Sequence, residues 1–134
     1  MNREILFKAK GKDNDEWVEG YYVFCRKHHY ILPILTEGIG YDEREDEWIE
    51  IDPDTLCQHT GRTDKNDKKI WENDIVNTFE EPSKEFLRNV IKFEDGCFKV
   101  FAEHYLSMHL DNYIKSDFEV VGNIFDNPDL LEVE

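Results

Sequence analysis

Short runs of aromatic and β-branched residues, separated by polar turns, recur along the whole chain and constrain its fold more than any other feature. Trp17–Phe24 is such a run, and Phe86–Phe93 and Cys97–Phe101 flank a turn at Glu94–Gly96. Residues of these types favour strands, and an Asp-Gly pair between two such runs favours a tight hairpin. Further strands are expected at Ile5–Phe7, Tyr30–Leu35, Trp48–Ile51, Leu56–His59, Ile70–Trp71, Asp74–Phe79 and Phe118–Phe125.

Helices are expected at only two places in the sequence. Leu106, Leu110 and Ile114 recur at a spacing of four residues, which predicts a helix over His104–Ile114. Pro128 suits the first position of a final short turn or helix. The expected fold class is therefore mainly β: a small barrel or sandwich with SH3-like barrel character and one or two short helices.

The length and charge of the chain limit its class and its partners. Its 134 residues fit one domain over 1–134, within which 1–60 would form an N-terminal β-hairpin lobe and 61–134 an SH3-like lobe. Its 31 acidic and 16 basic residues give a net charge of −15, which opposes direct DNA binding. No apolar run approaches the ~18 residues of a membrane span, and the first residues lack a signal-peptide core. We therefore expect no membrane association.

Patterns that carry known chemistry fail at their defining positions. An EF-hand-like start at Asp64 continues without the required glycine, where Lys69 stands instead. Cys25 and His28 have a ligand-like spacing, but the two basic residues between them disfavour a cation. Glycine-rich phosphate loops and a G-x-S-x-G nucleophile elbow are absent. We therefore expect no enzyme activity, no catalytic residue, no metal and no cofactor.

The number and spacing of the cysteines argue against a disulfide framework. Cys25, Cys57 and Cys97 form an odd and widely spaced set, each in an apolar or strand-like setting. Such cysteines usually behave as small buried hydrophobic residues in a reducing compartment. We expect the same behaviour here.

A distinctive run in the middle of the chain, Gln58–Val76, predicts a β-arch. A Thr-Gly pair near its start permits a sharp bend, and Asp64–Asp67 offers side-chain acceptors for a tight turn. Trp71 is expected to pack on the core. Asp74 is expected to accept hydrogen bonds from nearby backbone amides just before a strand begins.

This run, Q-H-T-G-R-T-D-K-N-D-K-K-I-W-E-N-D-I-V, resembles the signature of the YopX family of phage and prophage proteins, roughly Q-Y-T-G-L-x-D-K-N-G-K-x-I-Y-E-G-D-I-V. The segment Arg3–Tyr21 resembles the family's opening hairpin, and Phe118–Leu131 resembles its V-I-G-N-I-x-x-N-P-E-L-L ending. Asp67 and Asn73 stand where the family tends to have glycine. Both residue types tolerate positive φ, so the turns are expected to survive.

The resemblance implies a mainly β protein encoded by a phage, or by a bacterium that carries a prophage. We expect it to act in the bacterial cytoplasm. The resemblance supplies no catalytic residues. We expect a non-enzymatic accessory protein that binds a macromolecule, such as a host or phage protein. The alternative is an acidic mimic of nucleic acid that inhibits a host nuclease or polymerase, which would need its carboxylates in rows on one face.

The residues expected to matter fall into two groups. The basic residues of the signature run are candidate partner contacts: Arg62, Lys65, Lys68 and Lys69. The residues expected to form the structural signature are Thr60, Gly61, Asp64, Trp71, Asp74, Gly122, Asn123 and Pro128. Outside these groups, Trp17 is expected to pack into the core, because it begins a strand of aromatic and branched residues.

Overall fold

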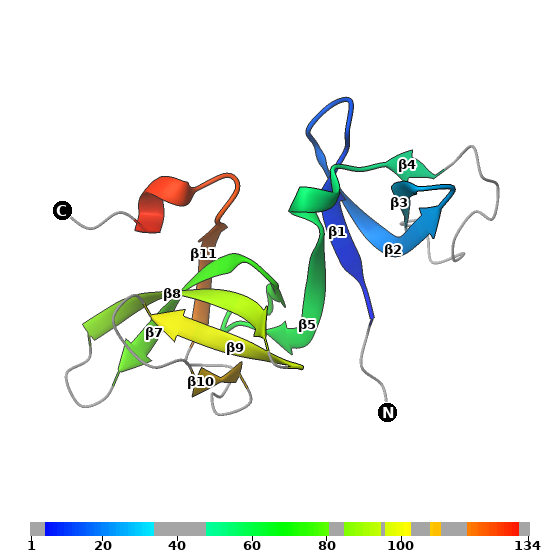
Figure 1. Ribbon diagram of the computed structural model, residues 1–134. Helices are drawn as coiled ribbons and strands as arrows, with labels where there is room; N and C mark the ends of the chain where they lie inside the picture. The colour runs from blue at the N-terminus through cyan, green and yellow to red at the C-terminus, as the bar shows by residue number, and fades with distance from the viewer. Residues whose placement is uncertain are drawn as a thin grey trace. The chain divides into compact units, whose positions relative to one another are not determined.

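The computed structural model describes residues 5–33, 48–80, 85–94, 96–102, 108–110 and 118–131. Within these ranges the chain forms eleven β-strands and two short 3₁₀ turns, so the predicted mainly β class is confirmed. The chain divides into two compact units, Met1–His59 and Thr60–Glu134. Antiparallel strands build both units (Figure 1).

The sheet of the first unit has the strand order β4-β3-β2-β1-β5. Its elements are β1 (Phe7–Lys10), β2 (Trp17–Cys25), β3 (His28–Pro33), β4 (Ile49–Glu50), the 3₁₀ turn η2 (Pro53–Thr55) and the start of β5 (Cys57–Thr63). Cys25 pairs with His28 across a two-residue turn in which Arg26 and Lys27 have φ values of 53° and 69°. Positive φ at both central residues gives a turn whose twist matches the flanking strands.

One face of this sheet forms a small core. Its fully buried members are Ala9, Ile31 and Ile51, with Phe7, Val18, Tyr22 and Leu56 packed against them. Trp17 lies on the opposite face, half-buried, with the Nζ atoms of Lys8 and Lys10 at 4.7 and 5.5 Å from its ring centroid. The prediction that Trp17 packs into the core is therefore wrong. Strand alternation gives the core position to Val18 instead.

The sheet of the second unit has the order β10-β9-β8-β7-β11. Its strands are β7 (Asp74–Glu80), β8 (Glu85–Glu94), β9 (Cys97–Ala102), β10 (Met108–His109) and β11 (Phe118–Asn123). Before them the end of β5 pairs with β6 (Lys69–Trp71), and after them comes the 3₁₀ turn η5 (Pro128–Leu131). Within the described strands the two edges, β10 and β11, are not bonded to each other, so this sheet is open rather than a closed SH3-like barrel.

The helix predicted over His104–Ile114 is wrong where the structure describes it. Met108 and His109 form β10 and pair with Val100 and Lys99 of β9. Apolar residues four positions apart are a local signal for a helix. Hydrogen bonding to a neighbouring strand overrides this signal. Residues 103–107 and 111–117 lie outside the described residues.

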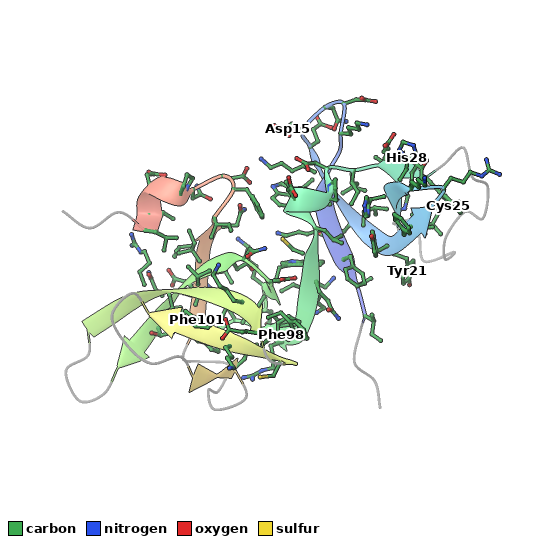
Figure 2. All side chains as sticks on the ribbon, viewed as in Figure 1. Asp15, Tyr21, Cys25, His28, Phe98 and Phe101 are labelled. Atoms are coloured by element: carbon green, nitrogen blue, oxygen red, sulfur yellow. The ribbon has the colours of Figure 1, made fainter. Side chains whose placement is uncertain are left out.

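The core of the second unit lies against the β7–β9 sheet. Its buried side chains are Ile70, Val76, Ile91, Val100, Leu110 and Phe118, and Phe98 and Val120 pack against them. Figure 2 shows Phe98 near the start of β9. Because the signature run contributes Ile70 and the C-terminal motif contributes Phe118, both motifs share this core.

Candidate functional site

The signature run folds around the carboxylate of Asp64, whose side chain is fully buried. Its Oδ1 atom accepts the amides of Asn66 and Lys68 at 2.8 and 2.9 Å, and its Oδ2 atom accepts the amide of Val120 at 2.9 Å. Asp67 has a φ of 64°, the left-handed conformation expected for this turn. The prediction that this segment supplies acceptors for a tight turn is confirmed.

The environment of Asp64 also fixes its protonation state. Burial raises the pKa of this carboxyl, but the amide hydrogen bonds and the charge of Lys68 outweigh burial and hold the pKa below its ordinary value of 3.8. Asp64 is therefore ionised at neutral pH and saturated with backbone donors. Such a carboxylate is suited to fixing a loop rather than to exchanging protons with a substrate.

The same loop covers the outer edge of β11. One side of β11 pairs with β7, and on its other side Asp64 accepts the amide of Val120. The amide of Lys65 donates to the carbonyl oxygen of Phe118 at 3.1 Å. Two residues of the loop therefore satisfy an edge strand that would otherwise present unpaired backbone groups.

Asp74 closes the second turn of the signature run. Its Oδ2 atom accepts the amide of Trp71 at 2.8 Å, and both side chains are buried. Between them, Asn73 has a φ of 71°, donates its amide to the carbonyl oxygen of Ile91 at 2.7 Å and accepts the amide of Ile124 at 3.1 Å. The predicted burial of Trp71 and the predicted backbone contact of Asp74 are both confirmed.

Thr60 and Gly61 form the bend at the start of the run. The buried hydroxyl of Thr60 donates to the carbonyl oxygen of Ile70 at 2.8 Å and accepts the amide of Arg62 at 3.2 Å. Gly61 has a φ of 87°, a conformation that favours glycine. The Thr-Gly pair therefore makes the sharp bend that the sequence predicts.

The C-terminal motif is a second network of side-chain caps. The Oδ1 atom of Asn123 accepts the amides of Phe125 and Asp126, each at 2.9 Å, and Asn127 Oδ1 accepts the amide of Asn123 at 3.2 Å. Gly122 lies so close that an added Cβ would stand 2.5 Å from Asn127 Oδ1. Pro128 follows as the first residue of η5, as the sequence predicts.

The four basic residues proposed as partner contacts differ in their surroundings. Arg62 is half-buried and donates from Nη1 to the carbonyl oxygen of Leu110 at 3.1 Å. The exposed Lys65 forms an ion pair of 2.9 Å with Glu119. Lys68 is exposed in the turn, and Lys69 is half-buried in β6. Their role as partner contacts stays a prediction, with Lys65 and Lys68 the better presented pair.

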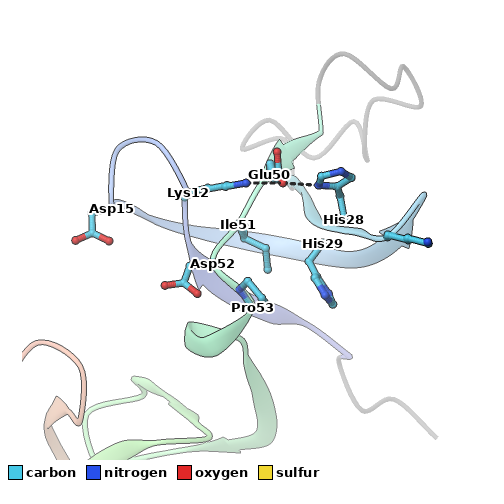
Figure 3. A pocket seen from close by; sticks show the side chains of 10 residues that line it. Lys12, Asp15, His28, His29, Glu50, Ile51, Asp52 and Pro53 are labelled. Atoms are coloured by element: carbon cyan, nitrogen blue, oxygen red, sulfur yellow. Dashed lines mark hydrogen bonds and ion pairs between the residues drawn. The ribbon is translucent and has the colours of Figure 1, made fainter.

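A pocket of about 340 Å³ in the first unit escaped the sequence reasoning (Figure 3). At its side, Glu50 Oε2 lies 2.8 Å from His28 Nδ1 and 3.4 Å from Lys12 Nζ. The hydrogen bond with His28 contributes most to holding the pKa of Glu50 below its ordinary value of 4.5, and Lys12 adds to it against the effect of desolvation. The basic pair Lys27–His28 is visible in the sequence, but only the pairing of β3 with β4 brings Glu50 to it.

Metal, disulfide and membrane features can be checked over the described ranges. There, no three His, Cys, Asp or Glu side chains come together as a metal site. All three cysteines are free thiols, with Cys57 buried and Cys25 and Cys97 half-buried. Over the same part of the chain, no helix has the length and apolar character needed to cross a membrane.

Comparison with known proteins decides the family. The sequence model described as "YopX protein" matches residues 6–132. The chain belongs to the YopX family. A crystal structure of protein EF1440 from Enterococcus faecalis is similar, with a TM-score of 0.58 and 24% sequence identity over 98% of this chain and 100% of that one. No curated protein matches the chain.

The family assignment confirms the resemblance drawn from three sequence motifs, and the structure explains how two of these motifs depend on each other. In this YopX protein, Asp64 of the middle run holds Val120 of the C-terminal motif, and Asn73 holds Ile124. The likeness to protein EF1440 shows the fold alone. In this chain, the middle run and the C-terminal motif are therefore joined by backbone and side-chain hydrogen bonds in the second unit.

Proposed function

We propose that this YopX protein is an accessory protein, encoded by a phage or prophage, that binds a partner macromolecule in the bacterial cytoplasm and catalyses no reaction. One observation carries the proposal. The buried carboxylate of Asp64 fixes the backbone of a loop from which Lys65 and Lys68 reach solvent. Binding residues are commonly held on loops by a rigid scaffold, because a loop fixed in advance loses little entropy on binding.

The charge of the loop indicates the chemistry of the partner. On a chain with a net charge of −15, this turn presents two exposed lysines with one exposed carboxylate, Asp67, between them. The Lys65 ammonium already lies 2.9 Å from the carboxylate of the half-buried Glu119, so a carboxylate of a partner would be a fitting replacement. A protein surface with acidic side chains is therefore the partner that we propose, and phosphate-rich DNA is disfavoured by the overall charge.

Polar side chains of the signature residues bind the backbone of the chain itself, which supports a role without catalysis. Asp64, Asp74 and Asn123 direct their side-chain oxygens to backbone amides. A general acid, base or nucleophile needs a group that can face a substrate. We give the acidic-mimic alternative less weight, because ion pairs such as Lys65–Glu119 place cations among the carboxylates.

The test is capture of a partner by the full chain from bacterial lysate, over a range of salt concentrations. Captured proteins are identified by mass spectrometry, and binding is then measured with the purified partner. We expect the variant Lys65→Ser with Lys68→Ser to keep the thermal transition of the wild-type chain and to lose most of its affinity.

A matched pair of single variants controls for charge. Lys68→Ser and Lys92→Ser each remove one exposed lysine from the second unit, but Lys92 lies on β8 outside the loop. We expect only the first to weaken binding. The proposal is wrong if the wild-type chain captures no partner at any salt concentration. The loop is not the site if Lys68→Ser and Lys92→Ser bind the partner equally.

A further inference from the structure

The pocket of the first unit contains none of the signature residues. Its walls come from the turn between β1 and β2, the turn between β2 and β3 with the start of β3, and the segment 50–53. Its volume of about 340 Å³ is at the lower end of the range for ligand sites, and suits one long side chain or a small molecule. Pro53, which is exposed, gives it an apolar part on which the methylene groups of a long side chain can lie.

Acidic and basic side chains both line this pocket. Glu50 is engaged by Lys12 and His28, so its charge is compensated within the pocket. The remaining charged residues of the lining are Lys27, in the turn before β3, and the two carboxylates Asp15 and Asp52. In the view of Figure 3, these two lie on one side of Lys12, and His28 lies on the other side beyond Glu50. The pocket therefore has a carboxylate end.

Hydrogen bonds fix the backbone of both residues. Asp15 has a φ of 60°, and its amide donates to the carbonyl oxygen of Gly11 at 3.0 Å. The amide of Asp52 donates to the carbonyl oxygen of Lys10 at 2.9 Å, and Asp52 Oδ1 accepts the amide of Asp54 at 3.0 Å. The second oxygen of Asp52 has no hydrogen-bond partner among the residues that the structure describes. It is therefore available to a donor that enters the pocket.

We propose that this pocket binds the ammonium or guanidinium group of a lysine or arginine side chain, presented by the partner protein, through Asp15 and Asp52. This inference rests on the proposed partner-binding function and adds a second contact with its own chemistry. Carboxylates accept strong charge-assisted hydrogen bonds from these cations. The net charge of −15 also raises the local concentration of cationic groups around the chain.

The test titrates the full chain with blocked peptides and follows backbone amide signals by NMR. The probes are acetyl-Gly-Arg-Gly-amide and acetyl-Gly-Lys-Gly-amide, with acetyl-Gly-Gln-Gly-amide as the uncharged control. We expect the two cationic peptides to shift the amide signals of Gly11 and Ile51, and the glutamine peptide to leave them in place. The relative affinities of the two cationic peptides distinguish a guanidinium site from an ammonium site.

Two double variants with the same change in net charge make the test specific. Asp15→Asn with Asp52→Asn removes both pocket charges, and asparagine tolerates the positive φ at 15 and can cap η2 at 52. Asp13→Asn with Asp54→Asn removes two exposed charges from the same two segments outside the pocket lining. We expect the first to weaken peptide binding about fivefold or more and the second by less than about twofold.

Three results would overturn the pocket assignment: no binding of either cationic peptide, equal weakening by the two double variants, or signal changes confined to residues away from the pocket. These results are separable from failure of the proposed function. If a captured partner binds the Asp15→Asn, Asp52→Asn variant as tightly as the wild-type chain, the pocket assignment falls and the partner-binding function stands. If no partner is captured, the partner-binding function falls, and the peptide titration decides the pocket alone.

Discussion

The carboxylate of Asp64 accepts the backbone amide of Val120, a residue 56 positions further along the chain, at 2.9 Å. This bond joins the middle signature run to the C-terminal motif of the YopX family. The same carboxylate also accepts the amides of Asn66 and Lys68, so one side chain shapes a turn and satisfies the edge of β11. The geometry of this loop and its contact with β11 therefore depend on one buried carboxylate.

Replacing Asp64 should destabilise the fold strongly. Asp64→Ala leaves three backbone amides without their acceptor, and we expect the free energy of unfolding to fall by about 3 kcal/mol, measured by denaturant titration. Glu119→Ala is the control, because it removes only the exposed ion pair with Lys65 and should change stability by less than about 1 kcal/mol. Equal effects of the two variants would contradict the role of Asp64.

The contribution of Asp64 should also depend on pH. Because its pKa in the folded chain lies below 3.8, the folded state keeps this carboxyl ionised where the unfolded chain already binds a proton. Its stabilisation is complete above about pH 5 and is lost as the pH falls through 3.8 and then through the folded pKa. The stability difference between the wild-type chain and Asp64→Asn should therefore shrink from pH 6 to pH 3. A difference that stays constant over this range would exclude this linkage.

Features that depend on neighbouring residues could be predicted from the sequence, and features that depend on distant strands could not. The turn at Asp64 and the positive φ of Asp67 and Asn73 were predictable, because short polar side chains and backbone preferences act within a few residues. The contact of Asp64 with Val120 was not, because it needs the position of β11. The pocket was missed for the same reason, since Glu50 reaches His28 only through the pairing of β4 with β3.

For Trp17 the sequence predicts the strand correctly but places the side chain on the wrong face of the sheet. The strand expected at Trp17–Phe24 forms as β2 (Trp17–Cys25), but the pairing of Lys10 with Trp17 places the indole beside two lysines rather than in the core. Truncation of a fully buried tryptophan to alanine lowers the free energy of unfolding by about 3–5 kcal/mol. For this half-buried ring, packed under Lys8 and Lys10, we expect Trp17→Ala to lower the unfolding free energy by about 1–2 kcal/mol. A denaturant titration that gives more than about 3 kcal/mol would restore a core role.

Variants of Asp74 and of the loop lysines should distinguish a residue that stabilises the fold from residues that are only exposed. Asp74→Ala leaves the buried amide of Trp71 without its acceptor, and we expect a loss of about 1–3 kcal/mol. Lys65→Ser with Lys68→Ser should change the unfolding free energy by no more than about 0.5 kcal/mol, because both side chains are exposed. Both values come from denaturant titration. A large loss in the lysine variant would mean that these side chains support the fold, and its binding defect would then have no simple interpretation.

The close approach of Gly122 to Asn127 can be tested with a double-mutant cycle. In Gly122→Ala the new methyl carbon would stand 2.5 Å from Asn127 Oδ1, so Asn127 must move and release the amide of Asn123. We expect Gly122→Ala to lower the unfolding free energy by about 1–3 kcal/mol, as overpacking does elsewhere. In a chain that already carries Asn127→Gly, the same change should lose less than about 0.5 kcal/mol, since the obstructing side chain is gone.

Gly96→Ala is the matched control for this cycle. An added Cβ at Gly96 meets no atom within 4 Å, but its φ of 81° disfavours any residue with a side chain. Its destabilisation of about 1 kcal/mol should therefore be the same with and without Asn127→Gly. If Asn127→Gly leaves the effect of Gly122→Ala unchanged, the glycine is required for a reason other than contact with Asn127. If it relieves both glycine variants equally, the coupling is not specific to this turn.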